Sequence, residues 1–399
     1  MSSATTAGPL KAPPREKNIV KAGVLSLVLL SLGHCFVDIY SGALGALQPL
    51  LVERMGLSLT EAGIIGGVFV IASSVLQPAY GYLSDRLHTR MFAALAPAVA
   101  GISISVLGMM SGFGWVLALV IVGGTAIAAF HPQASSTVTF GTDPGQRGRW
   151  MAIFVSGGTL GFALGPVYFS QAIELLGVSG IYWAALPGIA VSAFLLGYLP
   201  SPPRTATTGT KRLHIAPLVS IWKPLMILYF LVVLRSVVQI VFSQFLALYL
   251  NLERGFSYTT ANYTLTAYLG AGALGGFFGG YLSDRLGRRR VILLSMAGSV
   301  PFLLVFFFSG GVLSIVGLII GGFVLFFTIP VNVVMAQELA PEQAGTVSAL
   351  MMGFAWGVAG MIFVPLTGWA SDLFSIHHVL VSLLAAPVIG FFLALKLKK

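Results

Sequence analysis

The heptapeptide GYLSDRL occupies residues 81–87 and returns unchanged at residues 280–286. The two copies begin 199 positions apart (280 minus 81) in a chain of 399 residues, so they are separated by half the chain. Other matches keep the same offset, and these pair Ser58, Thr60 and Ala62 with Ser257, Thr259 and Ala261. An identical run of seven at this spacing does not arise by chance and predicts a duplicated structural unit.

The composition places this duplicated unit in a membrane. Hydrophobic residues make up 57% of the chain, Asp, Glu, Lys and Arg together only 9%, and the mean hydropathy is +0.93. Soluble domains carry about 25% charged residues. So few charges cannot cover the surface of a water-soluble fold of this length, and we predict an integral membrane protein.

The apolar runs have the length of helices rather than of barrel strands. A spanning helix needs about 20 mainly apolar residues, whereas a barrel strand needs about 10 that alternate. The sequence predicts twelve spans, at residues 22–52, 59–82, 91–111, 114–138, 148–172, 180–199, 221–251, 258–282, 291–309, 312–337, 345–370 and 375–395. With six spans in each copy, the predicted fold is an all-α membrane protein of two parallel, pseudo-symmetric six-helix bundles.

Four segments follow from these spans. Residues 1–20 form a polar N-terminal tail and residues 21–199 the first bundle, while residues 200–218 form a polar linker and residues 219–399 the second bundle. The chain contains no G-x-x-x-x-G-K-[ST] sequence, so it offers no such site for ATP hydrolysis.

The net charge of +10 is explained by topology rather than by an anionic partner. All of the 22 Lys and Arg residues except Arg54, Arg235 and Arg254 fall in the tails and in alternate loops on one side of the predicted spans. Basic loops stay in the cytoplasm, so both termini are predicted to be cytoplasmic. Nucleic acid is therefore not an expected partner.

The loop after the second span of each half carries the pattern G-x-x-x-D-R-x-G-R-R. Residues 280–289 fit this pattern fully, whereas residues 81–90 have His88 and Thr89 at the positions of a Gly and an Arg. Six plus six spans, a linker and this loop in each half resemble the major facilitator superfamily, and the likeness covers essentially the whole chain.

Shorter runs are similar to the fosmidomycin-resistance branch of drug exporters within that superfamily. They are HCFVD at 34–38, LQPLL at 47–51, LQP at 76–78, FHP at 130–132 and QEL at 337–339. The resemblance implies a secondary active transporter that exports a small molecule by alternating access.

The resemblance also implies that the repeated loop is a cytoplasmic gate, made by Gly81, Asp85, Arg86, Arg90, Gly280, Asp284, Arg285, Arg288 and Arg289. Glycine lets a neighbouring helix approach closely, and an aspartate suits a helix N-terminus, where unpaired amides carry about half a positive charge. Asp85 and Asp284 are expected to contact the opposite half and to hold the cytoplasmic side closed in one state. The alternative is that these charges only mark a cytoplasmic loop.

Glycines recur along the predicted span 148–172. Gly157, Gly161 and Gly165 are four residues apart and share one helix face, which permits close packing of another helix, and Pro166 follows them. A glycine-rich fifth helix ending in Gly-Pro resembles the antiporter signature of exporters. Small residues are also ordinary packing in membrane bundles, so this pattern favours export only modestly.

Two charged residues lie within predicted spans, where ionisable groups are costly and indicate functional sites. Asp38 lies near the middle of span 22–52, and Arg235 near the middle of span 221–251. The resemblance places both helices at a central cavity, so we expect a pair across it, direct or through water. A carboxyl group under the opposing effects of burial and of a nearby cation can bind and release a proton as the cavity alternates.

Polar residues extend this pair into an expected cavity lining, which comprises His34, Ser41, Gln48, His131, Ser135 and Gln239. His34 precedes Asp38 by four residues, so the two share a helix face. Two histidines near a carboxylate are potential metal ligands, but the sequence shows no dense His/Asp cluster, and no metal site is expected. His131 precedes Pro132, which disturbs helix hydrogen bonding, so a structural role for His131 is equally open.

Glu338, at the cytoplasmic end of span 312–337, is a second candidate for proton transfer, and the alternative is an interfacial carboxylate. Many proton-coupled exporters of the superfamily carry an arginine in the fourth span, whereas residues 115–130 contain no charge. Either Arg235 takes over that role or the coupling differs.

These features predict a proton-driven antiporter of the cytoplasmic (inner) membrane, in which one chain is sufficient. The expected partners are a small-molecule substrate, protons and the lipid bilayer, and the proton gradient supplies energy without a cofactor. A proton symporter or uniporter of a small organic ion or metabolite remains an alternative, because the shared motifs do not encode direction. A non-transporting membrane sensor is a second alternative. An enzyme is not expected, since no nucleophile and base stand in a recognisable motif.

Overall fold

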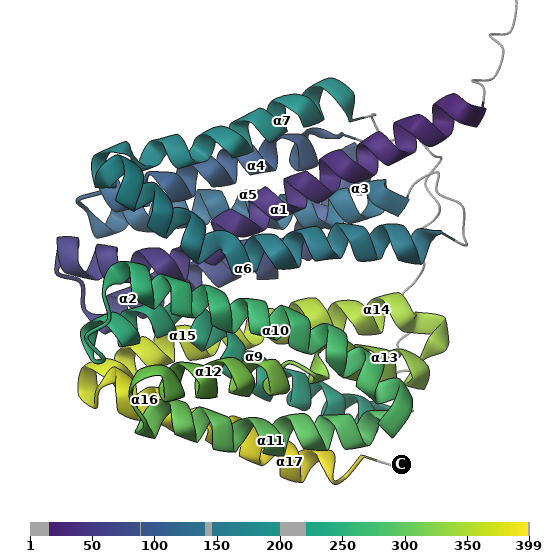
Figure 1. The fold of residues 1–399 in the computed structure, drawn as a ribbon. Coiled ribbons are helices and arrows are strands. Elements are labelled where there is room, and N and C mark those ends of the chain that lie inside the picture. Colours follow the sequence, from purple (N-terminus) through teal and green to yellow (C-terminus); the bar gives the residue numbers. More distant parts are fainter. Residues whose placement is uncertain (1–15, 88, 140–145, 200–220, 398–399) are drawn as a thin grey trace, which may run out of the picture.

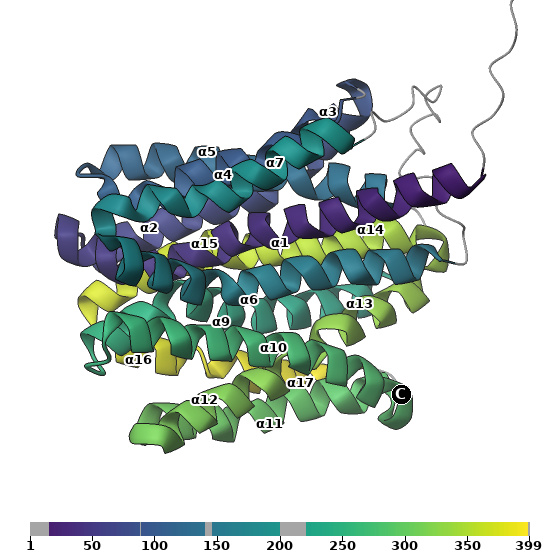
Figure 2. The same ribbon diagram turned by 45° about the horizontal axis from the view of Figure 1, so that its top comes forward.

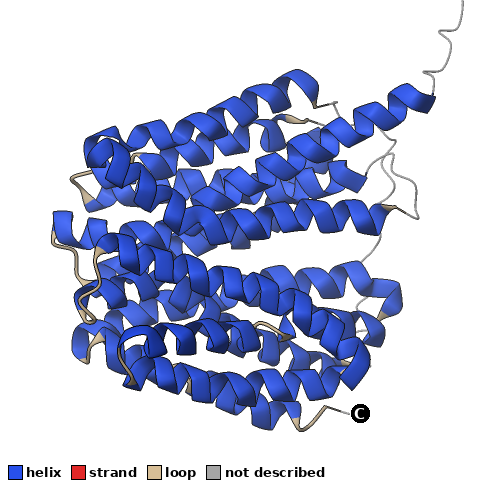
Figure 3. Cartoon of the chain, in the orientation of Figure 1, coloured by secondary structure: helices blue, strands red, loops and turns tan. Residues whose placement is uncertain are grey.

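The computed structural model describes residues 16–87, 89–139, 146–199 and 221–397, except for the side chains of 16–22, 85, 139, 344 and 345. Within these ranges every regular element is helical (Figure 3). Two stacks of helices lie against each other, one formed by the N-terminal half (16–199) and one by the C-terminal half (221–397) (Figure 1). The predicted linker 200–218 lies outside the described residues.

The N-terminal half contains α1 (Glu16–Met55), α2 (Leu59–Val70), the π-helical turn η1 (Ile71–Val75), α3 (Gln77–Leu87), α4 (Met91–Ser105), η2 (Leu107–Met109), α5 (Phe113–Thr139), α6 (Arg147–Gly180), η3 (Ile181–Ala185) and α7 (Leu186–Tyr198). The first helix thus begins inside the segment 1–20 that was predicted as a tail.

The C-terminal half contains α9 (Trp222–Leu252), α10 (Tyr258–Leu286), α11 (Arg288–Phe308), α12 (Gly311–Leu325), α13 (Thr328–Leu339), η4 (Pro341–Gln343), α14 (Ala344–Ala349), the π-helical turn η5 (Leu350–Phe354), α15 (Ala355–Leu373), α16 (Ile376–Ser382) and α17 (Ala385–Ala394). One hydrophobic core lies wholly in the N-terminal half, a second lies wholly in the C-terminal half, and a third joins the halves.

Ten helical segments of the described chain are long and apolar enough to cross a membrane. One of them, Arg147–Tyr198, has 52 residues and covers two predicted spans, with a break in helical geometry at Gly177 (φ 69°, ψ 169°). The predicted span 258–282 corresponds to α10, which is not among the ten because its Thr, Tyr, Asn and Gly residues lower its hydropathy. Every predicted span therefore has a helix, although the criterion counts ten segments and not twelve.

The repeated loop motif packs alike in the two halves. A Cβ atom added to Gly81 would lie 3.4 Å from Pro132 of α5, and one added to Gly280 would lie 3.6 Å from Pro330 of α13. These are ordinary contact distances, and both neighbours belong to the same half as the glycine.

The closest helix packing in the N-terminal half is that of α6 on α1, which lie side by side in both views (Figures 1 and 2). Cβ atoms added to Gly157, Gly161 and Gly165 would lie 2.7, 2.0 and 2.5 Å from the carbonyl oxygens of residues 31, 35 and 39 of α1. The glycine face predicted for this helix therefore lies directly against the backbone of α1.

The two halves are joined at the end of the molecule that lies away from the basic loops. We call the end that carries Arg86, Arg90, Arg288 and Arg289 the basic end, and the other the opposite end. At the opposite end, a Cβ added to Gly45 of α1 would lie 1.8 Å from the Ser243 carbonyl oxygen of α9. Hydrogen bonds between the halves join Val167 to Thr266 (3.1 Å), Asn262 to Ala46 (3.5 Å), Gln171 to Tyr263, and Asp372 to Leu59 and Thr60.

Three arginines at the basic end form hydrogen bonds within their own half. Arg90 donates to the Leu199 carbonyl, Arg288 to Glu338, and Arg289 to the Leu395 carbonyl at 3.0 Å. Beyond the π turns, α3 packs on α5 and α14 packs on α13, each inside one half. Asp284 is exposed, and the side chain of Asp85 is not described. The structure thus captures the state in which the opposite end is joined.

The packing of α6 on α1 predicts that Gly161→Ala lowers the free energy of unfolding by about 1–3 kcal/mol, because the added methyl group overpacks a contact between two backbones. Thermal unfolding of the purified protein in detergent measures the change. Gly270→Ala of α10 is the matched control, since nothing lies within 4 Å of the site of its added methyl group. Equal melting temperatures for the two variants would contradict the role assigned to Gly161.

Candidate functional site

A carboxylate and two imidazoles meet in the membrane-spanning part of the N-terminal half. Nε2 of His34 lies 3.3 Å from Oδ2 of Asp38, and Nε2 of His131 lies 3.4 Å from Oδ1. His34 and Asp38 come from successive turns of α1, as their spacing predicts, and His131 comes from α5. The side chains are 8%, 16% and 25% exposed for His34, Asp38 and His131. We call these three residues the triad.

Backbone carbonyls hold both imidazoles in place. Nδ1 of His34 lies 2.8 Å from the carbonyl oxygen of Phe154 in α6, and Nδ1 of His131 lies 2.8 Å from that of Ile127. A carbonyl oxygen can only accept a hydrogen bond, so each Nδ1 carries a proton. Both Nε2 atoms face Asp38.

The pocket around His34 is made by neighbours that the sequence analysis did not single out. The His34 ring stacks on Phe154 with ring centroids 4.2 Å apart and meets His131 edge-on at 5.1 Å. A Cβ atom added to Gly158 of α6 would lie 2.2 Å from Nε2 of His34, so only glycine leaves room for the ring. The adjacent glycines Gly157 and Gly158 were the sequence feature that could have indicated this pocket, but Gly158 lies off the glycine face predicted for this helix.

The triad must hold a proton between its members. With both Nδ1 positions protonated, a neutral imidazole would direct its Nε2 lone pair at a carboxylate oxygen, and two lone pairs repel. The contacts at 3.3 and 3.4 Å are attractive when Nε2 or the carboxyl group carries the proton. With both imidazoles protonated and the carboxyl group ionised, the triad carries a net charge of about +1. Loss of one proton turns one of the two contacts repulsive.

The three ligand atoms of the triad lie within 4.8 Å of one another and meet the geometric minimum for binding a metal ion. The sequence predicted no dense His/Asp cluster, and that prediction was wrong. His131 is far from His34 and Asp38 in the sequence, so no sequence pattern reveals the cluster. The packing of α5 on α1 brings the three residues together.

Arg235 of α9 does not pair directly with Asp38, contrary to the direct form of the expected pair. Its guanidinium donates to Gln239 one turn along the same helix, and among the described side chains no carboxylate lies within 4 Å of it. The helices α1 and α9 cross at Gly45 and Ser243. At 1.5 Å per residue, Asp38 lies about 10 Å from that crossing along α1, and Arg235 lies about 12 Å from it along α9. The two residues belong to different halves.

Arg235 is therefore a buried cation without a described counter-ion. Its exposed fraction is 6%, and its Nε has no hydrogen-bond partner. The phenol of Tyr268 on α10 interacts electrostatically with Arg235, and its hydroxyl also lacks a hydrogen bond. An unpaired charge in a membrane span is costly, so this group is suited to an anion that enters the protein.

Three other predicted residues have hydrogen-bond partners outside the triad. Gln48 is buried and donates to the Ala62 carbonyl at 3.0 Å, which ties α1 to α2. Ser135 donates to the Pro132 carbonyl of its own helix at 3.0 Å, and Ser41 is partly buried. Glu338 forms a two-pronged ion pair with Arg288 at the basic end, and its side chain is 55% exposed.

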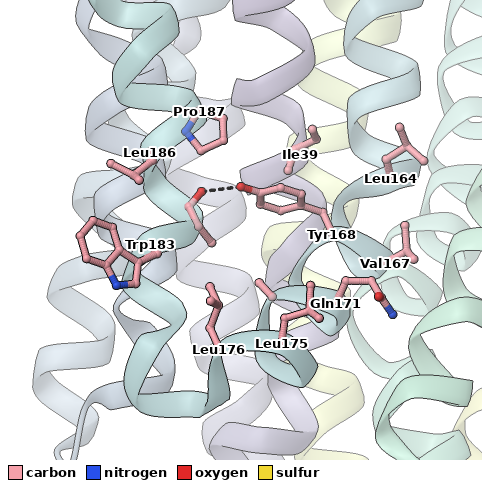
Figure 4. Close-up of a pocket in the computed structure, with 12 residues that line it drawn as sticks. Ile39, Leu164, Val167, Tyr168, Gln171, Leu175, Leu176, Trp183, Leu186 and Pro187 are labelled. Atoms are coloured by element: carbon pink, nitrogen blue, oxygen red, sulfur yellow. Dashed lines mark hydrogen bonds between the residues drawn. The ribbon is translucent and has the colours of Figure 1, made fainter.

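A separate apolar pocket is not lined by any residue of the triad. It measures about 560 Å³ and is lined by α1, α6, η3 and α7, with Leu164, Tyr168, Leu175 and Trp183 among its walls (Figure 4). Tyr168 closes one side by donating to the Ala184 carbonyl at 2.7 Å. Its lining is almost entirely apolar, so it lacks the charged groups that a proton or anion site needs.

These features define a class: a multi-pass helical membrane protein of the transporter type, with a titratable cluster in one half and a buried cation in the other. A family model described as Major Facilitator Superfamily matches residues 30–364. The chain belongs to the major facilitator superfamily.

Individual relatives agree with this assignment. The chain is 30% identical over 377 residues to the fosmidomycin resistance protein of Escherichia coli (strain K12), covering 92% of this chain and 91% of that one. It is also 30% identical over 397 residues to the uncharacterized MFS-type transporter YfnC of Bacillus subtilis (strain 168), covering 96% and 95%. In fold it is similar to a bacterial homolog of the human lysosomal transporter Spinster, solved inward-facing and unoccupied, with a TM-score of 0.79, 16% identity and coverage of 94% and 96%.

Proposed function

We propose that this transporter is a proton-driven antiporter that exports a small molecule carrying an anionic group. The observation that supports the proposal is the triad, in which Asp38 faces the Nε2 atoms of His34 and His131. In the proposed orientation the basic end and both termini face the cytoplasm, because basic loops are retained there. The joined opposite end then faces away from the cytoplasm, and the described state is inward-facing.

In this proposal the triad couples protons to the movement of the two halves. Protons hold Asp38 against both imidazoles, whereas loss of one proton makes one contact repulsive and loosens α1 from α5. Release of the proton to the cytoplasm and its rebinding from the other side would then favour different conformations of the transport cycle. The energy source is the proton gradient, and no metal is assigned to the site.

Arg235 supplies the substrate site of the proposal. Its guanidinium presents planar donors that suit phosphonate, phosphate, sulfonate or carboxylate oxygens, and Gln239 of the same helix accepts a hydrogen bond from it. The entering anion would provide the counter-ion that the described residues do not. The name of the Escherichia coli relative, a resistance protein, favours export over uptake, as do the glycines of α6.

The triad leads to the prediction that Asp38→Asn abolishes efflux driven by a pH gradient. The amide keeps the shape of the carboxylate but cannot carry the charge that holds two imidazolium groups. The measurement uses reconstituted vesicles with an internal pH dye and fosmidomycin as the first compound of a panel of small anions. Proton movement opposite to the substrate distinguishes antiport from symport.

Glu174→Gln is the control for this variant, because Glu174 is an exposed carboxylate at the end of α6 that lies outside the triad. A parallel Glu338→Gln variant tests the second candidate for proton transfer. A chelator is expected to leave transport unchanged. Full gradient-driven efflux by Asp38→Asn would remove Asp38 from the mechanism.

Arg235→Gln is expected to weaken the binding of an anionic substrate about tenfold to a hundredfold, since a charge-assisted contact to a buried anion is lost. Equilibrium binding to the purified protein measures the dissociation constant separately from the transport rate. Arg235→Lys keeps the charge but not the planar arrangement of donors, so its affinity is expected to lie between those of the unmodified protein and of Arg235→Gln. An unchanged affinity in Arg235→Gln would place the anion elsewhere.

A further inference from the structure

One carboxylate of the C-terminal half caps a helix of the N-terminal half. Asp372, in the last turn of α15, accepts hydrogen bonds from the amides of Leu59 at 2.9 Å and Thr60 at 2.8 Å. It also accepts one from the Thr60 hydroxyl at 2.5 Å. These three bonds link residues more than 310 positions apart in the chain and lie at the opposite end of the molecule.

The N-terminus of α2 needs this partner from the other half. The first amides of a helix have no acceptor within it, and the partial positive charge there favours a carboxylate. Ser58 and Glu61 form a capping box that satisfies the amide of Glu61 and that of Ser58. The amides of Leu59 and Thr60 are left to Asp372, so α2 is fully capped only while the halves are together.

The hydrogen bonds of Asp372 lie beside a seam, by which we mean the contact between the backbones of α2 and α15 at Gly63 and Gly368. A Cβ atom added to Gly368 of α15 would lie 2.2 Å from the Leu59 carbonyl oxygen, and one added to Gly63 of α2 would lie 2.9 Å from that of Val364. Asp372 itself is exposed. The seam sets how closely the helices approach, and the carboxylate is the charged contact that water can replace when they separate.

We infer that Asp372 is the latch that holds the opposite end closed, and that its release accompanies the opening of that end. It acts through the position of α2 and touches neither the triad nor Arg235. The inference goes beyond the proposed function, because it concerns the equilibrium between the two states of the transporter and holds whatever the substrate is.

The molecule contains its own control for this contact. Glu253 accepts from the amides of Ile376 at 2.7 Å and His377 at 2.9 Å, and so caps the N-terminus of α16 in the same way. Glu253 and α16 both belong to the C-terminal half. The chemistry is the same, but the bonds do not cross between the halves.

The test measures distances across the opposite end in the full-length protein without substrate or pH gradient. Spin labels are attached at Glu53→Cys and Val312→Cys, two exposed positions in different halves, after Cys35→Ser removes the single native cysteine. Asp372→Ala is expected to raise the ratio of long to short distances about tenfold, the effect of losing a helix cap. Glu253→Ala is expected to leave that ratio unchanged.

Two further variants keep the test decisive. Asp372→Asn preserves the size of the side chain and is expected to shift the ratio in the same direction by less, should Asp372→Ala not fold. Thr60→Val removes only the hydroxyl donor, and its effect should disappear when Asp372→Ala is already present, because the two share one interaction. An unchanged distance ratio in both Asp372 variants, or an equal change in Glu253→Ala, would overturn the latch and leave the proton-coupling proposal untouched.

Discussion

The N-terminal half depends on one constraint, the direct contact between the backbones of α6 and α1. Three glycines let the carbonyl oxygens of α1 approach α6 where any side chain would collide. A fourth, Gly158, leaves the space that the His34 ring fills. At this separation the Phe154 carbonyl reaches Nδ1 of His34 and fixes which nitrogen faces Asp38. The chemistry of the triad is thus a result of helix packing.

The two halves carry different chemistry. The N-terminal half holds the groups that exchange protons, and the C-terminal half holds the guanidinium of Arg235, which bonds to Gln239 of the same helix. In the proposed mechanism the proton and the substrate therefore do not compete for one carboxylate. Each acts on its own half, and the two are coupled by the contacts that hold the halves together.

The sequence was sufficient for the architecture and for part of the site. The heptapeptide repeat and the apolar runs predicted a helix at each span, and the four-residue spacing predicted that His34 and Asp38 share a face. The contact with His131 was not predictable, because it depends on how α5 packs on α1. The same holds for Gly158, whose role is to be small beside a ring from another helix.

The expected pair of Asp38 with Arg235 shows the limit of reasoning from equivalent positions. Both residues lie in the first helix of their half, but each bonds inside that half. Asp372 was missed for a different reason: a single aspartate near a helix end has no distinguishing pattern, and its partner amides belong to the backbone of α2.

The paired π-helical turns set the rotational phase of the two helices that meet between the halves. η1 follows α2, η5 precedes α15, and the two turns face each other. A π turn accommodates one residue more than an α-helical turn, and one residue corresponds to about 100° of rotation. The face of α2 that meets α15 is therefore not the face that continues along α3, the helix that contains Gly81. Removal of one residue from η1 is therefore expected to turn α3 by about 100° relative to the contact of α2 with α15.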